Sequence, residues 1–205
     1  MGQKGTPMNV DARHLAIGMK GAWDVFRKFE WETAIYNELA QRKVPLGAEA
    51  YIENSHPLFA AINAASTAWS LVEWVWFEVE LHPEKLAAFV KIGGTQCPSD
   101  APNLDQLKHE LRRTNSALDV CHQVAHAAKH VQLRTVTKGL STEVTFDVWQ
   151  RAGYLYWSTN ASVRRSPDDT GEPIERHFDQ LKIFWRKVLS DLAIPDRANS
   201  TDQAR

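Results

Sequence analysis

The sequence predicts a mainly α-helical fold, in which a four-helix core carries a small antiparallel β-hairpin inserted before the last helix. Apolar residues recur at helical spacing over most of the chain, and β-branched and polar residues alternate over about 133–164. Helical spacing then returns after a polar loop. We expect residues 1–10 to form a flexible N-terminus, residues 11–194 a single α-rich domain, and residues 195–205 a disordered tail.

Composition limits the classes of protein that the chain can belong to. Its 205 residues are 43% hydrophobic and 24% charged, which is an ordinary globular mixture with enough residues for a real core. The net charge of −1 gives no overall basic field for nucleic acid, so an RNA partner would need a local patch. Two cysteines do not make a disulfide framework, and no segment has the length and hydrophobicity of a membrane span. We therefore expect a cytoplasmic protein that does not associate with membranes.

Two of the predicted helices lie at the start of the chain. The first is expected over about 11–42, with Gly18 and Gly21 predicting a break in its first half. The second is expected to begin after Asn54 or Ser55 and to end near residue 80. Apolar residues cover most of the second helix, which predicts a central position in the fold. Its narrow polar strip includes Ser70 and Glu73, which need polar partners from another helix.

Three more helices are predicted further along the chain. A short helix over 83–92 is closed by Gly93 and Gly94, and the last helix runs over about 173–192 until Pro195 stops it. Between them, one long helix is expected over about 103–132. Its apolar stripe lies beside a stripe of polar side chains: Lys108, Arg112, Asn115, Asp119, His122, His126 and His130.

The histidines of this polar stripe have the spacing of a possible metal site. Residues four apart on a helix lie about 6 Å apart along its axis, so His126 and His130 could share a zinc ion. Zinc enzymes with this spacing add a glutamate between the two histidines, which is absent here, although Glu73 could reach across as a third ligand. Zinc therefore stays an open alternative, and nothing else in the sequence calls for a cofactor.

The same stripe could instead perform acid/base chemistry on a phosphodiester. Asp119 lies one turn before His122 and could fix its tautomer, while Lys129 supplies positive charge near His126. Glu73, facing the stripe from the second helix, would complete a candidate catalytic set of Glu73, Asp119, His122, His126, Lys129 and His130. In the competing interpretation, the same residues are the polar flank of a packed helix.

Two segments resemble a family of uncharacterised bacterial and phage helical proteins. They are A-W-S-L-V-E-W-V-W, residues 68–76, and L-D-V-C-H-Q-V-A-H-A-A-K-H, residues 118–130. Cys121, Lys129 and His130 match the family pattern. Four positions depart from it: Ser70, Glu73, His122 and His126 stand where the family tends to have His, Asp, Arg and Asn.

The arrangement also resembles the HEPN class of helical ribonucleases, whose working motif is an arginine followed four to six residues later by a histidine. No arginine of the predicted long helix has a histidine at that distance. We therefore favour a non-catalytic helical interaction protein of a bacterial mobile element, phage or defence system. It would bind a protein partner or a second copy of itself. The alternative is a HEPN-like, toxin-like ribonuclease that acts through the polar stripe.

Overall fold

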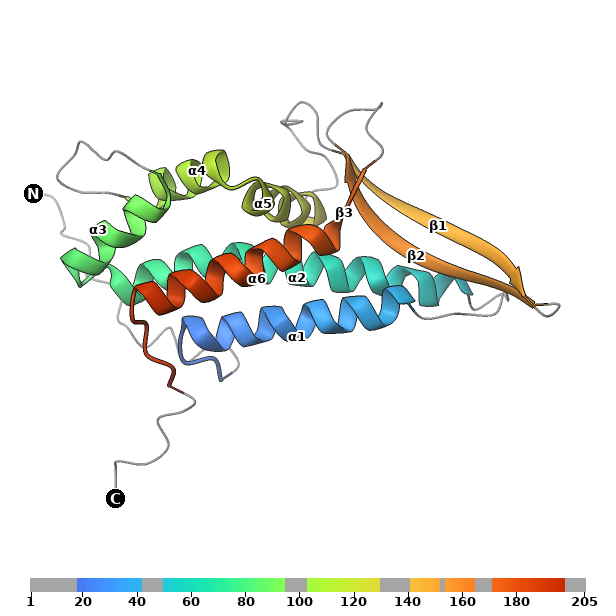
Figure 1. Cartoon of the computed structure of the whole chain (residues 1–205), viewed down its shortest axis with the longest axis horizontal. Helices are drawn as coiled ribbons and strands as arrows, with labels where there is room; N and C mark the ends of the chain where they lie inside the picture. Colours follow the sequence, from blue (N-terminus) through green and yellow to red (C-terminus); the bar gives the residue numbers. More distant parts are fainter. Residues whose placement is uncertain are drawn as a thin grey trace, which may run out of the picture.

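The computed structural model describes residues 18–41, 50–94, 103–129, 141–151, 154–164 and 171–197. These residues form six helices and a three-stranded sheet (Figure 1), so the prediction of a mainly helical fold is confirmed. In chain order the elements are α1 (Ala22–Gln41), α2 (Ala50–Val79), α3 (Pro83–Ile92), α4 (Leu104–Thr114), α5 (Ser116–Lys129), β1 (Ser141–Arg151), β2 (Tyr154–Arg164), β3 (Glu172–Pro173) and α6 (Ile174–Asp191).

Helix α2 lies at the centre of the helical part, as its apolar circumference predicts. It contacts α1, α3, α4, α5 and α6. Ala64, Ala65 and Ala68 have no exposed surface, and such small side chains let neighbouring helices approach closely. The predicted start at Asn54 or Ser55 is wrong, because α2 already begins at Ala50 and Pro57 lies inside it. A proline removes one helical hydrogen bond, and packing on several neighbours compensates for that loss.

Helix α1 begins later than the spacing of its apolar residues predicts. Residues 11–17 lie outside the described part of the chain, and the helix starts only at Ala22. Gly18 has φ +74°, a left-handed conformation that glycine adopts without strain and that interrupts a right-handed helix. At Gly21, a β-carbon would lie 2.8 Å from Glu78 Oε1. The two glycines therefore explain the predicted break and the close approach of this chain segment to α2.

The predicted long helix over 103–132 is two helices, and this prediction is wrong. Asn115 separates α4 from α5 with an extended backbone, φ −125° and ψ 99°. Its backbone N–H still donates to Leu111 O at 2.9 Å, while its side-chain Oδ1 accepts from the N–H groups of Ala117 and Leu118 at 3.1 and 3.2 Å. Asn115 thus ends one helix and caps the next, which compensates for the hydrogen bonds lost at the break.

The remaining elements complete the helical core and the sheet. Helix α3 has the predicted bounds, and Gly94, at φ +75°, supplies the left-handed residue after it. Helix α6 places Ile174, Phe178 and Trp185 in the core. Strands β1 and β2 pair antiparallel from Ser141 opposite Arg164 to Arg151 opposite Tyr154, and β2 also contacts α1, α2 and α6. In Figure 1 these two strands extend away from one end of the helices.

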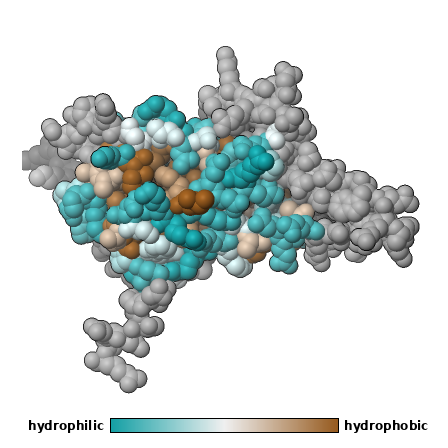
Figure 2. Space-filling view, in the orientation of Figure 1, coloured by the Kyte–Doolittle hydropathy of each residue, from teal (hydrophilic) through white to brown (hydrophobic). Residues whose placement is uncertain are grey.

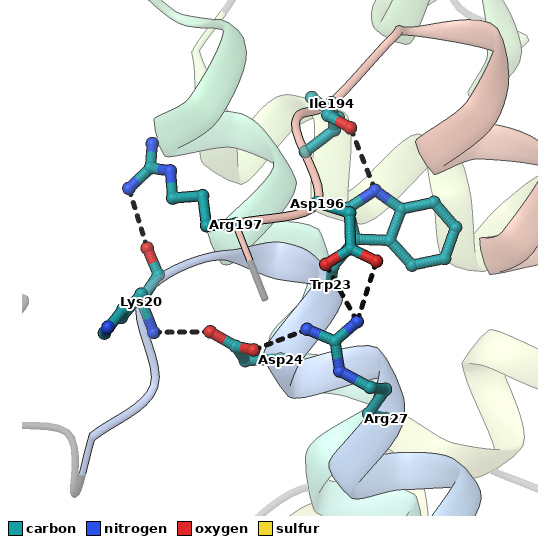
Figure 3. Close-up of polar contacts among 7 residues, drawn as sticks. All are labelled: Lys20, Trp23, Asp24, Arg27, Ile194, Asp196 and Arg197. Atoms are coloured by element: carbon teal, nitrogen blue, oxygen red, sulfur yellow. Dashed lines mark hydrogen bonds and ion pairs between the residues drawn. The ribbon is translucent and has the colours of Figure 1, made fainter. Parts of the chain in front are cut away.

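The last described residues fold back onto the start of α1 (Figure 3). Trp23 Nε1 donates to Ile194 O at 2.9 Å, and Arg27 Nη1 bonds both carboxylate oxygens of Asp196 at 2.9 and 3.0 Å. Arg197 donates to Lys20 O at 2.8 Å. Asp196 and Arg197 therefore contact the start of α1, whereas the sequence predicted a disordered tail that begins at residue 195.

Two of the predictions fall partly or wholly on chain outside the described ranges. The flexible N-terminus, residues 1–10, and residues 198–205 of the predicted tail lie outside them. None of the described helices combines the length and the apolar composition that a bilayer crossing requires.

Candidate functional site

Six polar side chains come from helices α2, α4 and α5 where these helices meet, and we call them the polar seam: Glu73, Lys108, Arg112, Asp119, His122 and His126. All of them except Glu73 belong to the predicted polar stripe. Helix α2 contributes Glu73, α4 contributes Lys108 and Arg112, and α5 contributes the others. Glu73 does reach across to the stripe, but its Oε1 is ion-paired with Lys108 Nζ. The Ser70 hydroxyl, in contrast, donates to Thr67 O of its own helix at 2.9 Å.

Asp119 has partners for both of its carboxylate oxygens. Arg112 Nε donates to Oδ1 at 2.9 Å, and Gln123 Nε2 donates to Oδ2 at 2.7 Å. The pair with Arg112 spans the helix break and joins α4 to α5. The Nδ1 atom of His122 has no hydrogen-bond partner within the described part of the chain, so the role of Asp119 in setting the tautomer of His122 stays a prediction.

His122 lies between aromatic and cationic side chains. Its ring packs edge-on to Trp69 at a centroid distance of 4.6 Å, and the His126 ring lies 5.8 Å away. Burial is the main cause that lowers the pKa of His122 from 6.5 to about 4, and the positive charge of Arg112 adds to it against the opposing effect of Asp119. His122 is therefore neutral at neutral pH, and its buried Nδ1 has no hydrogen-bond partner.

The last turn of the stripe lies at the edge of the described chain. Lys129 is the final residue of α5, and its side chain is not described, while His130 lies outside the described residues. The zinc pair of His126 and His130 thus stays a prediction, as does the charge of Lys129 beside it. Among the residues that are described, no three or more His, Cys, Asp or Glu side chains are grouped to hold a metal ion.

Of the three residues that carry the resemblance described above, Cys121 is the one whose side chain the structure describes. It is fully buried in the core beside the polar seam, and burial raises the pKa of its thiol well above the ordinary range. A buried thiol that stays protonated is neither a nucleophile nor a metal ligand. Cys121 therefore has a packing role.

The sequence did not reveal a surface hollow at the junction of α4 and α5. This elbow hollow has a volume of about 540 Å³ and is lined by His109, Arg112, Arg113, Ser116 and Asp119. It exists because the chain turns at Asn115, whereas a straight helix would have placed Arg113 and Ser116 on its outer surface. An asparagine followed by a serine and an acidic residue is a helix-start signal, and it was the one sequence feature that could have indicated this turn.

A second polar cluster lies between α1 and α6. Tyr36 donates to Glu175 at 3.0 Å, and His177 Nε2, on a buried side chain, lies 3.5 Å from Glu172. Helical periodicity predicted the position of α6 without indicating this cluster, because His177 falls on the buried face among apolar residues.

Comparison of the chain with protein-family models, with curated proteins and with solved structures found no match in any of the three.

Proposed function

We propose that the chain is a non-catalytic helical interaction protein. The observation that supports this proposal most is that both carboxylates of the polar seam have protein partners. Glu73 is ion-paired with Lys108, and Asp119 accepts hydrogen bonds from Arg112 and Gln123. A general base needs a free lone pair within reach of a substrate proton and a pKa near the working pH. With its carboxylates paired and His122 at a pKa of about 4, the polar seam is better suited to holding three helices together than to chemistry.

We include in this proposal the four-helix, HEPN-like arrangement that the resemblance implies, with β1 and β2 as a hairpin insertion. Contacts support it, because α1 contacts α2, α2 contacts α5, α5 contacts α6 and α6 contacts α1. Four helices in such a closed cycle share one core. The setting in a mobile element, phage or defence system rests on the resemblance alone. The proposal involves no cofactor and a cytoplasmic location.

Two exposed apolar side chains, one on α1 and one on α6, support a binding role, and we call the face that carries them the α1–α6 surface. Trp31 is 64% exposed and Ile183 is 73% exposed. Trp31 follows Glu30 on α1 and Ile183 precedes Arg186 by about one turn on α6, and Glu30 and Arg186 join the two helices by an ion pair at 2.5 Å. Figure 2 shows hydrophobic residues exposed on the α6 side of the helical part, while the α1 side of the same face is mostly hydrophilic. Exposed tryptophan on a packed helix is typical of the centre of a protein interface.

We propose a second copy of the chain as the occupant of this α1–α6 surface. The surface carries one acidic and one basic side chain side by side, Glu30 and Arg186. A two-fold axis through such a surface would place Glu30 of one copy near Arg186 of the other, with the apolar side chains between them. Neutral, self-complementary charge of this kind favours a protein partner over nucleic acid.

Light scattering during size-exclusion chromatography tests the proposed self-association. We expect the full chain to form a dimer whose share rises with concentration, and the double variant Trp31→Ser/Ile183→Ser to remain monomeric. Leu81→Ser is the matched control, because Leu81 is 79% exposed but lies beyond the end of α2, and it should leave the dimer intact. A monomer at all concentrations, or equal loss in both variants, would contradict the proposed surface.

One observation favours the alternative of a HEPN-like ribonuclease. The buried Nδ1 of His122 has no partner, and an unsatisfied buried polar group costs about 1–3 kcal/mol. The His126 ring beside it gives a pair of imidazoles, which are the usual proton carriers in phosphodiester cleavage.

A further inference from the structure

The elbow hollow has unused hydrogen-bond donors on its arginines. Arg112 bonds Asp119 through Nε, and nothing in the described chain bonds its two Nη groups. Arg113 directs Nε and Nη2 to Glu110, each at 2.9 Å, which leaves its Nη1 group. Ser116, at the start of α5, adds a hydroxyl to the lining. The hollow therefore presents several donors whose positions are set by other bonds.

The acceptors near these donors are already occupied. Both oxygens of Asp119 accept hydrogen bonds, from Arg112 and Gln123. Glu110 Oε2 accepts from Arg113, and its Oε1 lies 3.4 Å from His109 Nδ1. Free donors without protein acceptors have to be satisfied from outside the protein, either by water or by an anionic ligand.

We infer that the elbow hollow binds a phosphate group. Guanidinium groups match the oxygens of a phosphate in spacing and plane, and Arg112, Arg113 and Ser116 line the same hollow. The lining carries two arginines and one carboxylate, Asp119, whereas Glu110, the ion-pair partner of Arg113, is not among the lining residues. A volume of about 540 Å³ also leaves room for the rest of a phosphate ester.

This inference is independent of the proposed self-association. The α1–α6 surface and the elbow hollow are formed by different helices. Phosphate binding could therefore fail while the dimer is observed, and the reverse also holds.

Titration of the full chain with inorganic phosphate, followed by amide chemical shifts at constant ionic strength, tests the inference. We expect saturable shifts, centred on α4 and α5, that chloride does not produce. Arg113→Gln should weaken binding about tenfold, equivalent to about 1.4 kcal/mol, because it removes one cation from the hollow. Arg113 is 61% exposed and paired within its own helix, so the variant should keep its melting temperature.

Arg176→Gln is the matched control, since Arg176 is 71% exposed and lies on α6 with Glu172 as its partner. This variant should bind phosphate as the wild type does. Ser116→Ala should weaken binding less than Arg113→Gln, because it removes a neutral donor. No saturable shifts, or the same affinity in the Arg113 and Arg176 variants, would overturn the inference.

A short single-stranded RNA in the same titration identifies the source of the phosphate. RNA that binds, competes with inorganic phosphate and loses about one unit of salt dependence in Arg113→Gln would place a nucleic-acid backbone in the hollow. Phosphate that binds where RNA does not would indicate a free phosphate or a small phosphate ester. RNA binding that Arg113→Gln leaves unchanged would count against the hollow.

Discussion

Replacing Trp185 with alanine is expected to lower the free energy of unfolding by about 3–5 kcal/mol, the usual range for removing a buried tryptophan. The side chain has no exposed surface, and its Nε1 donates to Ala68 O of the central helix at 3.1 Å. The variant therefore leaves a cavity between α6 and α2 and breaks their buried hydrogen bond.

Urea unfolding at equilibrium measures this effect, with the slope of the transition compared between variants. Trp185→Phe should cost less, about 1–3 kcal/mol, because it keeps most of the volume and loses mainly the hydrogen bond. Leu81→Ala is the exposed control, since Leu81 is 79% exposed, and it should change stability by no more than about 0.5 kcal/mol. Equal midpoints for Trp185→Ala and Leu81→Ala would contradict the packing of α6 on α2.

The second large effect is a loss of stability at acidic pH that depends on His122. The folded protein lowers the pKa of this imidazole from 6.5 to about 4. Between these values the unfolded chain binds a proton that the folded chain does not, so the free energy of unfolding falls as pH decreases through this window. Above pH 6.5 the contribution no longer changes. We expect a loss on the order of 1–2 kcal/mol, since His122 keeps some contact with solvent that screens the charge.

His122→Gln isolates this contribution from the carboxylates that titrate in the same range. The difference in stability between wild type and His122→Gln should shift against the wild type as the pH falls from about 7 to 4. His109→Gln is the control, because the His109 side chain is 74% exposed and its Nδ1 lies 3.4 Å from Glu110 of its own helix. A wild-type and His122→Gln difference that is constant with pH would contradict a buried, neutral His122.

Spacing of apolar residues predicted the helices well because burial on one face is a local property of the sequence. Helix α3 has the predicted bounds, and α6 buries Ile174, Phe178 and Trp185 as the spacing predicts. The start of α2 could not be predicted in this way, because tertiary packing decides whether a helix continues past a proline.

The sequence did not predict the break at Asn115, because the apolar stripe continues across it. Leu111 and Leu118 are both buried, and seven residues are two turns of a straight helix. In that straight helix Arg112 and Asp119 would lie roughly 10 Å apart along the axis. The turn at Asn115 brings Arg112 Nε to 2.9 Å from Asp119 instead. The members of the candidate site could thus be predicted in part, but their pairing depends on a turn that periodicity does not detect.

We propose that the polar seam holds helices together and is not a catalytic site. Incubation of RNA with an excess of the full chain tests it most directly, with melting temperatures measured on the same wild-type, His122→Gln and Asp119→Asn proteins. We predict no cleavage above background for any of the three, and a lower melting temperature for Asp119→Asn because Arg112 loses its charged partner. Cleavage by the wild type that His122→Gln abolishes at an unchanged melting temperature would contradict the claim.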